Sequence, residues 1–217
     1  MEVITDLHCR ALRCRVCFAE DTRLKAPIID VAQPRWVGTR FRDARPRIVF
    51  LMLNPGAGDP SKDAGNRDAR RLLLRFRDGG ATFENVLAFQ REHMESWGKP
   101  VGRFLRFYIR GLDLELEDVA FLNIALCATL GNRYPRRMLD RCFEDHSGTI
   151  LQQLKPDLVV LCGVVIARRF RKKISALCPS AKVVAMLHHA HRKGRNAEAI
   201  EQAQLRGVIN ALAETSV

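Results

Sequence analysis

Four short apolar runs, separated by stretches of helical spacing, most constrain what this chain can fold into. Each run has the length and β-branched content of a strand that is buried on both faces. The runs lie at about 47–53, 119–124, 157–162 and 182–187, and helical patterns occur at 67–77, 100–111, 136–154, 164–175 and 196–213. Strands that alternate with helices form right-handed βαβ units around a parallel sheet. The sequence therefore predicts an α/β protein, three-layer α/β/α, with a central, mostly parallel four-stranded sheet.

The size and charge of the chain limit its organisation and its partners. A chain of 217 residues that is 47% hydrophobic suits a single globular domain over residues 1–217. No apolar run reaches membrane-spanning length, and the first ten residues lack the form of a signal peptide. We therefore expect a cytoplasmic monomer without membrane contact. The net charge of +12 favours a polyanionic partner, nucleic acid first, although a solvated basic surface is the alternative.

Polar residues follow the predicted strands at the point where each strand ends. The first run stops at Asn54, because the Pro55-Gly56 sequence after it cannot continue a strand. The second run passes through Asn123, and the fourth leads to His188. The carboxyl ends of parallel strands share one edge of a sheet, where ligands bind. We therefore expect Asn54, Asn123 and His188 to converge on one cleft.

The seven cysteines are unevenly distributed. In a cytoplasmic protein they argue against a disulfide framework and for metal binding, chemistry or simple burial. Cys14 and Cys17 form a CxxC motif, while Cys127 and Cys142 lie far downstream. Cys162 ends an apolar run and is most simply a small buried side chain.

Four short motifs suggest a family. They are "LNPG" at 53–56, "FLNIALC" at 121–127, "GNRYP" at 131–135 and "HHAHR" at 188–192. In their order and spacing they make the chain resemble the uracil-DNA glycosylase superfamily, and in particular its iron–sulfur branch with an Asn-Pro-Gly first motif. The resemblance implies a DNA glycosylase of base excision repair. Such an enzyme flips a nucleotide out of double- or single-stranded DNA and hydrolyses its N-glycosidic bond, leaving an abasic site.

The resemblance also implies a role for individual residues. Asn54 would position the attacking water and His188 would stabilise the leaving base. Contacts to the flipped base would come from Asn123, Leu53 and Gly56, and contacts to DNA from Arg133, His189, His191, Arg192, Lys193 and Arg195. Each role has a structural alternative. For Asn54 the alternative is a turn cap, as asparagine forms in loops, and for Asn123 it is a side chain that satisfies strand-end backbone. For His188 it is a buried structural histidine that leaves its role to His191. For residues 189–195 it is a solvated basic turn.

Cys14, Cys17, Cys127 and Cys142 match the cysteines of the iron–sulfur branch in their order along the chain. The resemblance therefore implies a structural [4Fe–4S] cluster that ties the N-terminal segment, residues 1–46, to the rest of the domain. Four thiolates can hold such a cluster or a tetrahedral zinc ion. Cysteines without a ligand are the third alternative.

Three departures from the family leave the substrate open. Leu53 stands where the branch usually has an acidic residue, residues 57–74 contain no aromatic side chain, and His189 replaces the proline of the last motif. We expect the substrate to be uracil or a bulkier modified pyrimidine. Hypermodified cytosine of phage DNA is an example, and it would imply a role in phage defence. The alternatives are a catalytically weak or inactive DNA-binding protein on a glycosylase fold and a hydrolase that acts on RNA or nucleotides.

Overall fold

A computed structural model describes residues 2–55, 63–96, 108–188 and 197–215. The chain divides into two compact units, each built from three separate stretches. The first unit comprises Met1–Arg35, Asn54–Gln90 and Asn123–Gln153, and the second comprises Trp36–Leu53, Arg91–Leu122 and Leu154–Val217. A single domain over residues 1–217 stays a prediction.

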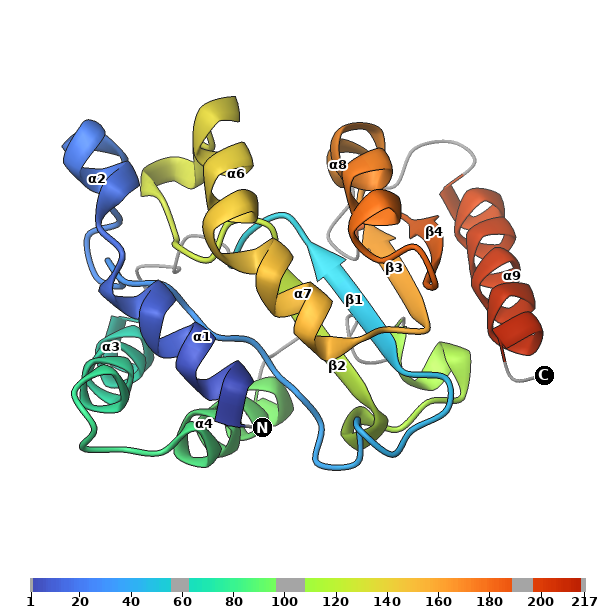
Figure 1. The fold of residues 1–217 in the computed structure, drawn as a ribbon, viewed down its shortest axis with the longest axis horizontal. Coiled ribbons are helices and arrows are strands. Elements are labelled where there is room, and N and C mark those ends of the chain that lie inside the picture. The colour runs from blue at the N-terminus through green and yellow to red at the C-terminus, as the bar shows by residue number, and fades with distance from the viewer. Residues whose placement is uncertain (1, 56–62, 97–107, 189–196, 216–217) are drawn as a thin grey trace. The chain divides into compact units, whose positions relative to one another are not determined.

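The sheet has four strands, as expected from the four apolar runs. They are β1 (Ile48–Met52), β2 (Val119–Asn123), β3 (Leu158–Cys162) and β4 (Lys182–Met186), in the spatial order β2-β1-β3-β4 (Figure 1). The pairing is parallel, with Ile48 opposite Leu158 and Leu158 opposite Lys182. This all-parallel sheet with its helices confirms the predicted fold class and is consistent with a three-layer α/β/α architecture.

Burial distinguishes the first three strands along the chain from the fourth. Every residue of β1, β2 and β3 is buried, whereas only Met186 of β4 is. In the second unit the Phe50 ring packs 5.4 Å from Phe121 and 5.5 Å from Tyr108, centre to centre. The Tyr108 hydroxyl donates to the Leu187 carbonyl at 2.8 Å. A buried tyrosine needs such a partner, and this bond holds the chain just after β4.

Two helices of the second unit pack on β3 and β4. They are α8 (Val164–Leu177) and α9 (Ala197–Thr215) (Figure 1). Gly163 links β3 to α8 with a φ of +127°, a conformation open to glycine and strained for other residues. The described residues of this unit also form the 3₁₀ turns η3 (Arg110–Leu112) and η4 (Leu116–Asp118).

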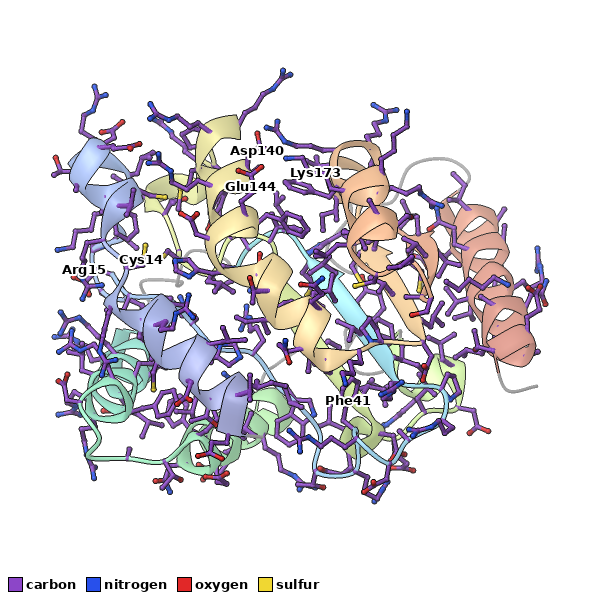
Figure 2. All side chains as sticks on the ribbon, in the orientation of Figure 1. Cys14, Arg15, Phe41, Asp140, Glu144 and Lys173 are labelled. Carbon is purple, nitrogen blue, oxygen red and sulfur yellow. The ribbon has the colours of Figure 1, made fainter. Side chains whose placement is uncertain are left out.

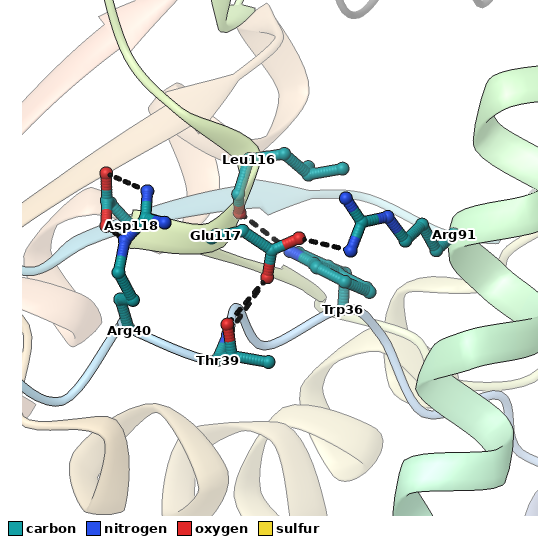
Figure 3. A network of polar contacts seen from close by, with 7 residues as sticks. All are labelled: Trp36, Thr39, Arg40, Arg91, Leu116, Glu117 and Asp118. Atoms are coloured by element: carbon teal, nitrogen blue, oxygen red, sulfur yellow. Dashed lines mark hydrogen bonds and ion pairs between the residues drawn. The ribbon is translucent and has the colours of Figure 1, made fainter.

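A polar network fixes the chain at residues 36–40 beside the start of β2 (Figure 3). Glu117 is its centre, accepting a hydrogen bond from the Thr39 hydroxyl at 2.9 Å and pairing with Arg91 at 2.8 Å. Gly38 is required in this segment, because a Cβ there would lie 2.1 Å from the Glu117 carbonyl oxygen. The other members of the network are Trp36, which donates to the Leu116 carbonyl, and the Arg40–Asp118 ion pair.

The first unit is mainly helical. Its elements are α1 (Glu2–Arg13), α2 (Val16–Glu20), η1 (Thr22–Leu24), α3 (Asp63–Arg77), η5 (Leu130–Asn132), α6 (Arg136–Cys142), the π-helical turn η6 (Phe143–Ser147) and α7 (Gly148–Leu154). Helix α4 (Phe83–Ser96) begins in this unit. The π turn is held by Ser147, whose buried hydroxyl donates to the Ile124 carbonyl at 2.8 Å.

Most of the predicted helices are confirmed. The patterns at 67–77, 164–175 and 196–213 correspond to α3, α8 and α9, and the pattern at 136–154 corresponds to α6, η6 and α7 in succession. The pattern at 100–111 falls largely outside the described residues; its end forms part of η3. Among the described residues, no helix is long and apolar enough to cross a membrane.

Candidate functional site

In the first unit the Asn123 amide lies beside the turn that follows Asn54. Asn54 follows β1, and Asn123 is the last residue of the neighbouring strand β2. One terminal atom of the Asn123 amide lies 3.2 Å from the backbone nitrogen of Pro55. This contact is not a hydrogen bond, because a proline nitrogen carries no hydrogen. The Asn123 amide therefore lies beside the backbone that follows Asn54, and the predicted convergence of Asn54, Asn123 and His188 on one cleft stays a prediction.

Arg35, which the sequence did not suggest, also contacts Asn123. Its Nε and Nη2 lie 2.7 Å and 3.2 Å from the same amide atom. A guanidinium only donates hydrogen bonds, so this atom is the amide oxygen Oδ1. Asn123 is fully buried and Arg35 is partly buried. Burial lowers the pKa of Arg35 to about 10, and its guanidinium therefore remains positively charged at neutral pH.

The pairing of two backbone segments positions Arg35 near Asn123. Ala32 forms an antiparallel bridge with Cys127, and the Gln33 N–H donates to the Leu126 carbonyl at 2.8 Å. In an antiparallel pair, each step forward along one segment is a step back along the other. Arg35 therefore falls close to Asn123.

Asn54 has partners in the turn that contains the "GNRYP" motif. Its Nδ2 donates to Asn132 Oδ1 at 3.2 Å. Asn132 has a φ of +55°, a left-handed conformation that asparagine tolerates better than most residues. The side chain of Tyr134 also hydrogen-bonds with Asn54, and its hydroxyl donates to the Cys127 carbonyl at 3.3 Å. Burial raises the pKa of Tyr134, so the phenol stays protonated at neutral pH and can serve as a donor.

The remaining predicted site residues have different locations. Leu53 is half-buried at the end of β1, and Arg133 is exposed beside Asn132. His188 is half-buried and follows β4 in the second unit. A Cβ added to Gly163 would lie 3.6 Å from the Cβ of His188. Its approach to the two asparagines stays a prediction. Gly56, His189, His191, Arg192, Lys193 and Arg195 lie outside the described residues.

A cavity in the first unit is lined by all four cysteines of the predicted cluster, Cys14, Cys17, Cys127 and Cys142. Its wall also includes the apolar side chains Phe18, Leu126 and Met138 and the charged side chains Arg15, Arg141 and Asp145. Figure 2 shows Cys14 and Arg15 between α1 and α2. Residues more than 100 positions apart thus place their thiols around one space, which is what a shared cluster requires.

Burial dominates the electrostatics of the thiols. Burial raises the pKa of Cys142 to about 12 and the pKa of Cys127 well above its ordinary value, and neighbouring thiols add to both effects. The Leu126 N–H donates to Cys142 Sγ at 3.3 Å. In the part of the chain that the structure describes, no three Cys, His, Asp or Glu side chains form a group that could hold one metal ion as they stand. The donor set nevertheless fits an iron–sulfur cluster, since it provides four thiols around one cavity.

His146 is a second residue that the sequence did not suggest. It lines the same cavity from the π turn. Its Nε2 is buried and has no hydrogen-bond partner among the described groups, which is uncommon for a buried polar atom. Burial lowers the pKa of His146, and this favours a neutral ring with one N–H.

No protein-family model matches the chain, and no curated protein matches it.

Proposed function

We propose that the protein is a DNA N-glycosylase. It flips a nucleotide out of DNA and hydrolyses the N-glycosidic bond, releasing uracil or a bulkier modified pyrimidine. The observation that carries this proposal is the contact of the Asn54-Pro55 turn with the Asn123 amide. This contact supports a site in which two uncharged amides from neighbouring strand ends act together, Asn54 by orienting water and Asn123 by reading a base edge.

The expected transition state carries positive charge on the sugar and negative charge on the leaving base. The carbonyl oxygen of the Asn54 amide can orient a water molecule, since its Nδ2 already donates to Asn132. An amide has no useful basic pKa, so Asn54 acts by position and not by taking the proton. His188 supplies a donor to the developing charge on the base. The protein therefore relies on tight binding or on a good leaving group.

The proposed cofactor is a structural [4Fe–4S] cluster held by Cys14, Cys17, Cys127 and Cys142. When bound, it would cross-link the α1–α2 connection to the chain after β2 and to the end of α6. DNA is the proposed partner, with a phosphate contact from Arg133 and with residues 189–195 entering the helix to hold the gap that the flipped nucleotide leaves. The net charge of +12 supports a polyanion. We propose a cytoplasmic monomer, with phage defence as its role if the base is a hypermodified cytosine.

One observation favours a second candidate function, a DNA-binding protein with little or no catalysis. The Asn54 side chain is engaged with Asn132 and Tyr134, as expected of an asparagine that stabilises a turn. The two candidates differ in a simple way, because only a glycosylase leaves abasic sites in the DNA it binds.

The test is mass spectrometry of the bases released from a panel of DNAs: unmodified, uracil-containing and hypermodified phage DNA. Wild type is compared with Asn54→Ala and with Asn210→Ala, a matched change at an exposed position of α9. Release by wild type and Asn210→Ala, with loss in Asn54→Ala, supports the glycosylase and names its base. DNA binding without release of any base would instead support the second candidate.

A further inference from the structure

The backbone of Leu187 is held by side chains at the point where the sheet ends. Strand β4 stops at Met186, whose partner in the parallel ladder is Cys162. Beyond it, the Leu187 N–H donates to Gln204 Oε1 at 2.5 Å. The Leu187 carbonyl accepts a hydrogen bond from the Tyr108 hydroxyl at 2.8 Å. Two side chains thus supply the hydrogen bonds that a neighbouring strand supplies inside the sheet.

These hydrogen bonds orient the two peptide groups that lead into His188. The first joins Met186 to Leu187 and is held at both ends. Its carbonyl accepts a hydrogen bond from the Gly163 N–H at 2.8 Å, and its N–H donates to the side chain from α9. The second joins Leu187 to His188, and its carbonyl is the one that Tyr108 holds. A peptide group is planar, so the orientation of the second one places the Cα of His188.

Both anchoring side chains belong to packed parts of the second unit. Tyr108 is fully buried, and its ring centre lies 5.5 Å from that of Phe50 in β1. Gln204 is half-buried in α9, which packs on β4. His188 also lies close to the start of α8, since a Cβ added to Gly163 would lie 3.6 Å from its own Cβ. The position of His188 therefore depends on segments that are far apart in the sequence.

We infer that Tyr108 and Gln204 are positioning residues that act through the backbone of Leu187 to hold His188 in place for the reaction. This inference rests on the proposed function, in which His188 stabilises the leaving base, and it assigns neither residue a contact with the substrate. A donor stabilises a transition state best when it is already in position. A displacement of about 1 Å can cost about a hundredfold in rate, so the hydrogen bonds that place His188 contribute to catalysis.

Three substitutions remove or keep single hydrogen bonds. Tyr108→Phe removes the hydroxyl and keeps the ring. Gln204→Met keeps the size of the side chain and removes the acceptor, whereas Gln204→Glu keeps an acceptor oxygen for the Leu187 N–H. Gln202→Met, at an exposed position of the same helix, is the matched control. Thermal unfolding establishes that each variant is folded.

The first measurement does not depend on catalysis. Isotope-labelled histidine gives ring resonances in NMR spectra, and the resonance that is missing from His188→Gln belongs to His188. We expect Tyr108→Phe and Gln204→Met to shift or broaden this resonance, while Gln204→Glu and Gln202→Met stay close to wild type. If folded Tyr108→Phe and Gln204→Met both keep the wild-type resonance, the inference is overturned, whatever the protein does to DNA.

The second measurement is kcat and KM for base release. Tyr108→Phe and Gln204→Met should each lower kcat by about tenfold at an unchanged KM, because only an interaction made in the transition state is weakened. In a His188→Ala background neither substitution should lower kcat further, since no histidine is left to position. Losses that multiply in that background would show an effect independent of His188 and would overturn the inference.

Failure of the proposed function is distinguishable from failure of the inference. A wild-type protein that releases no base from any DNA would overturn the glycosylase, and with it the catalytic part of the inference. The ring resonances would then still decide whether Tyr108 and Gln204 hold His188 in place.

Discussion

Replacing Asp30 with asparagine should destabilise the segment that carries Arg35. The Asp30 carboxylate is 14% exposed, with Oδ1 at 2.8 Å from Arg70 Nε and Oδ2 at 3.0 Å from Lys25 Nζ. It thus links α3 to the chain that runs from η1 towards Arg35. Asparagine has almost the same shape but no charge, so the substitution removes both ion pairs and little packing.

The magnitude follows from the pKa of Asp30. Burial acts to raise this pKa, but hydrogen bonds from Arg70 and Lys25 outweigh it and lower the pKa from 3.8 to about 2. Each unit of pKa shift corresponds to about 1.36 kcal/mol. The lowered pKa of Asp30 therefore corresponds to roughly 2 kcal/mol of folding stability. Arg70 and Lys25 are 39% and 52% exposed, and screening by solvent reduces the expected loss in Asp30→Asn to about 1–2 kcal/mol.

The sign of the pH dependence is also fixed. The folded-state pKa of Asp30 lies below its unfolded value, so its contribution is complete above about pH 4 and is lost as the pH falls towards 2. Urea unfolding followed by circular dichroism at pH 7, 5 and 3 measures it. Asp43→Asn, at an exposed position, is the control. Equal stabilities of wild type and Asp30→Asn at pH 7, or a difference that does not shrink by pH 3, would refute the reasoning.

Three further outcomes are expected. Cys142→Ser should lose bound iron and sulfide, whereas Cys162→Ser, buried in the other unit, should keep both; equal iron content in the two variants would remove Cys142 from the ligands. Gly38→Ala should lower the free energy of unfolding by about 1–3 kcal/mol, because its Cβ would overlap a backbone carbonyl, while Gly207→Ala, with open space around it in α9, should stabilise slightly; chemical denaturation measures both. His146→Phe should shift the midpoint potential of the reconstituted cluster in a redox titration, since it removes a buried N–H beside the cavity; an unchanged potential would show that this group does not act on the cluster.

The sheet was predictable because its strands are continuous apolar runs. All five residues of β1, of β2 and of β3 are buried, so each run stands out from its neighbours without any alternation to interpret. Helix α4 had a weaker pattern and was missed. Its start is set by Thr82 and Asn85, whose side chains each bond the other's backbone N–H at 3.3 Å and 2.9 Å, a local capping arrangement with asparagine in place of the usual Glu or Gln.

Only those site residues that follow a strand or belong to a recognisable motif could be predicted from the sequence. Asn54 and Asn123 occupy strand ends, and the contact of the Asn123 amide with the Asn54-Pro55 turn follows from the adjacency of β1 and β2. Arg35 had no such signal. It lies between Pro34 and Trp36 with no periodic pattern, and its role depends on a register set by residues near 126 and 127. Pairing between segments so distant in sequence is a tertiary property that local patterns do not contain.

The spacing of the four cavity cysteines has a consequence for biosynthesis. Cys17 leaves the ribosome long before Cys127, and at roughly 5–20 residues per second the 109 intervening residues, counted from the sequence, take on the order of 5–20 s. During that interval the nascent chain exposes one CxxC pair without its partners. Insertion of the proposed iron–sulfur cluster would then wait for nearly two thirds of the polypeptide, and premature capture of another metal by Cys14 and Cys17 is the hazard that such a delay would create.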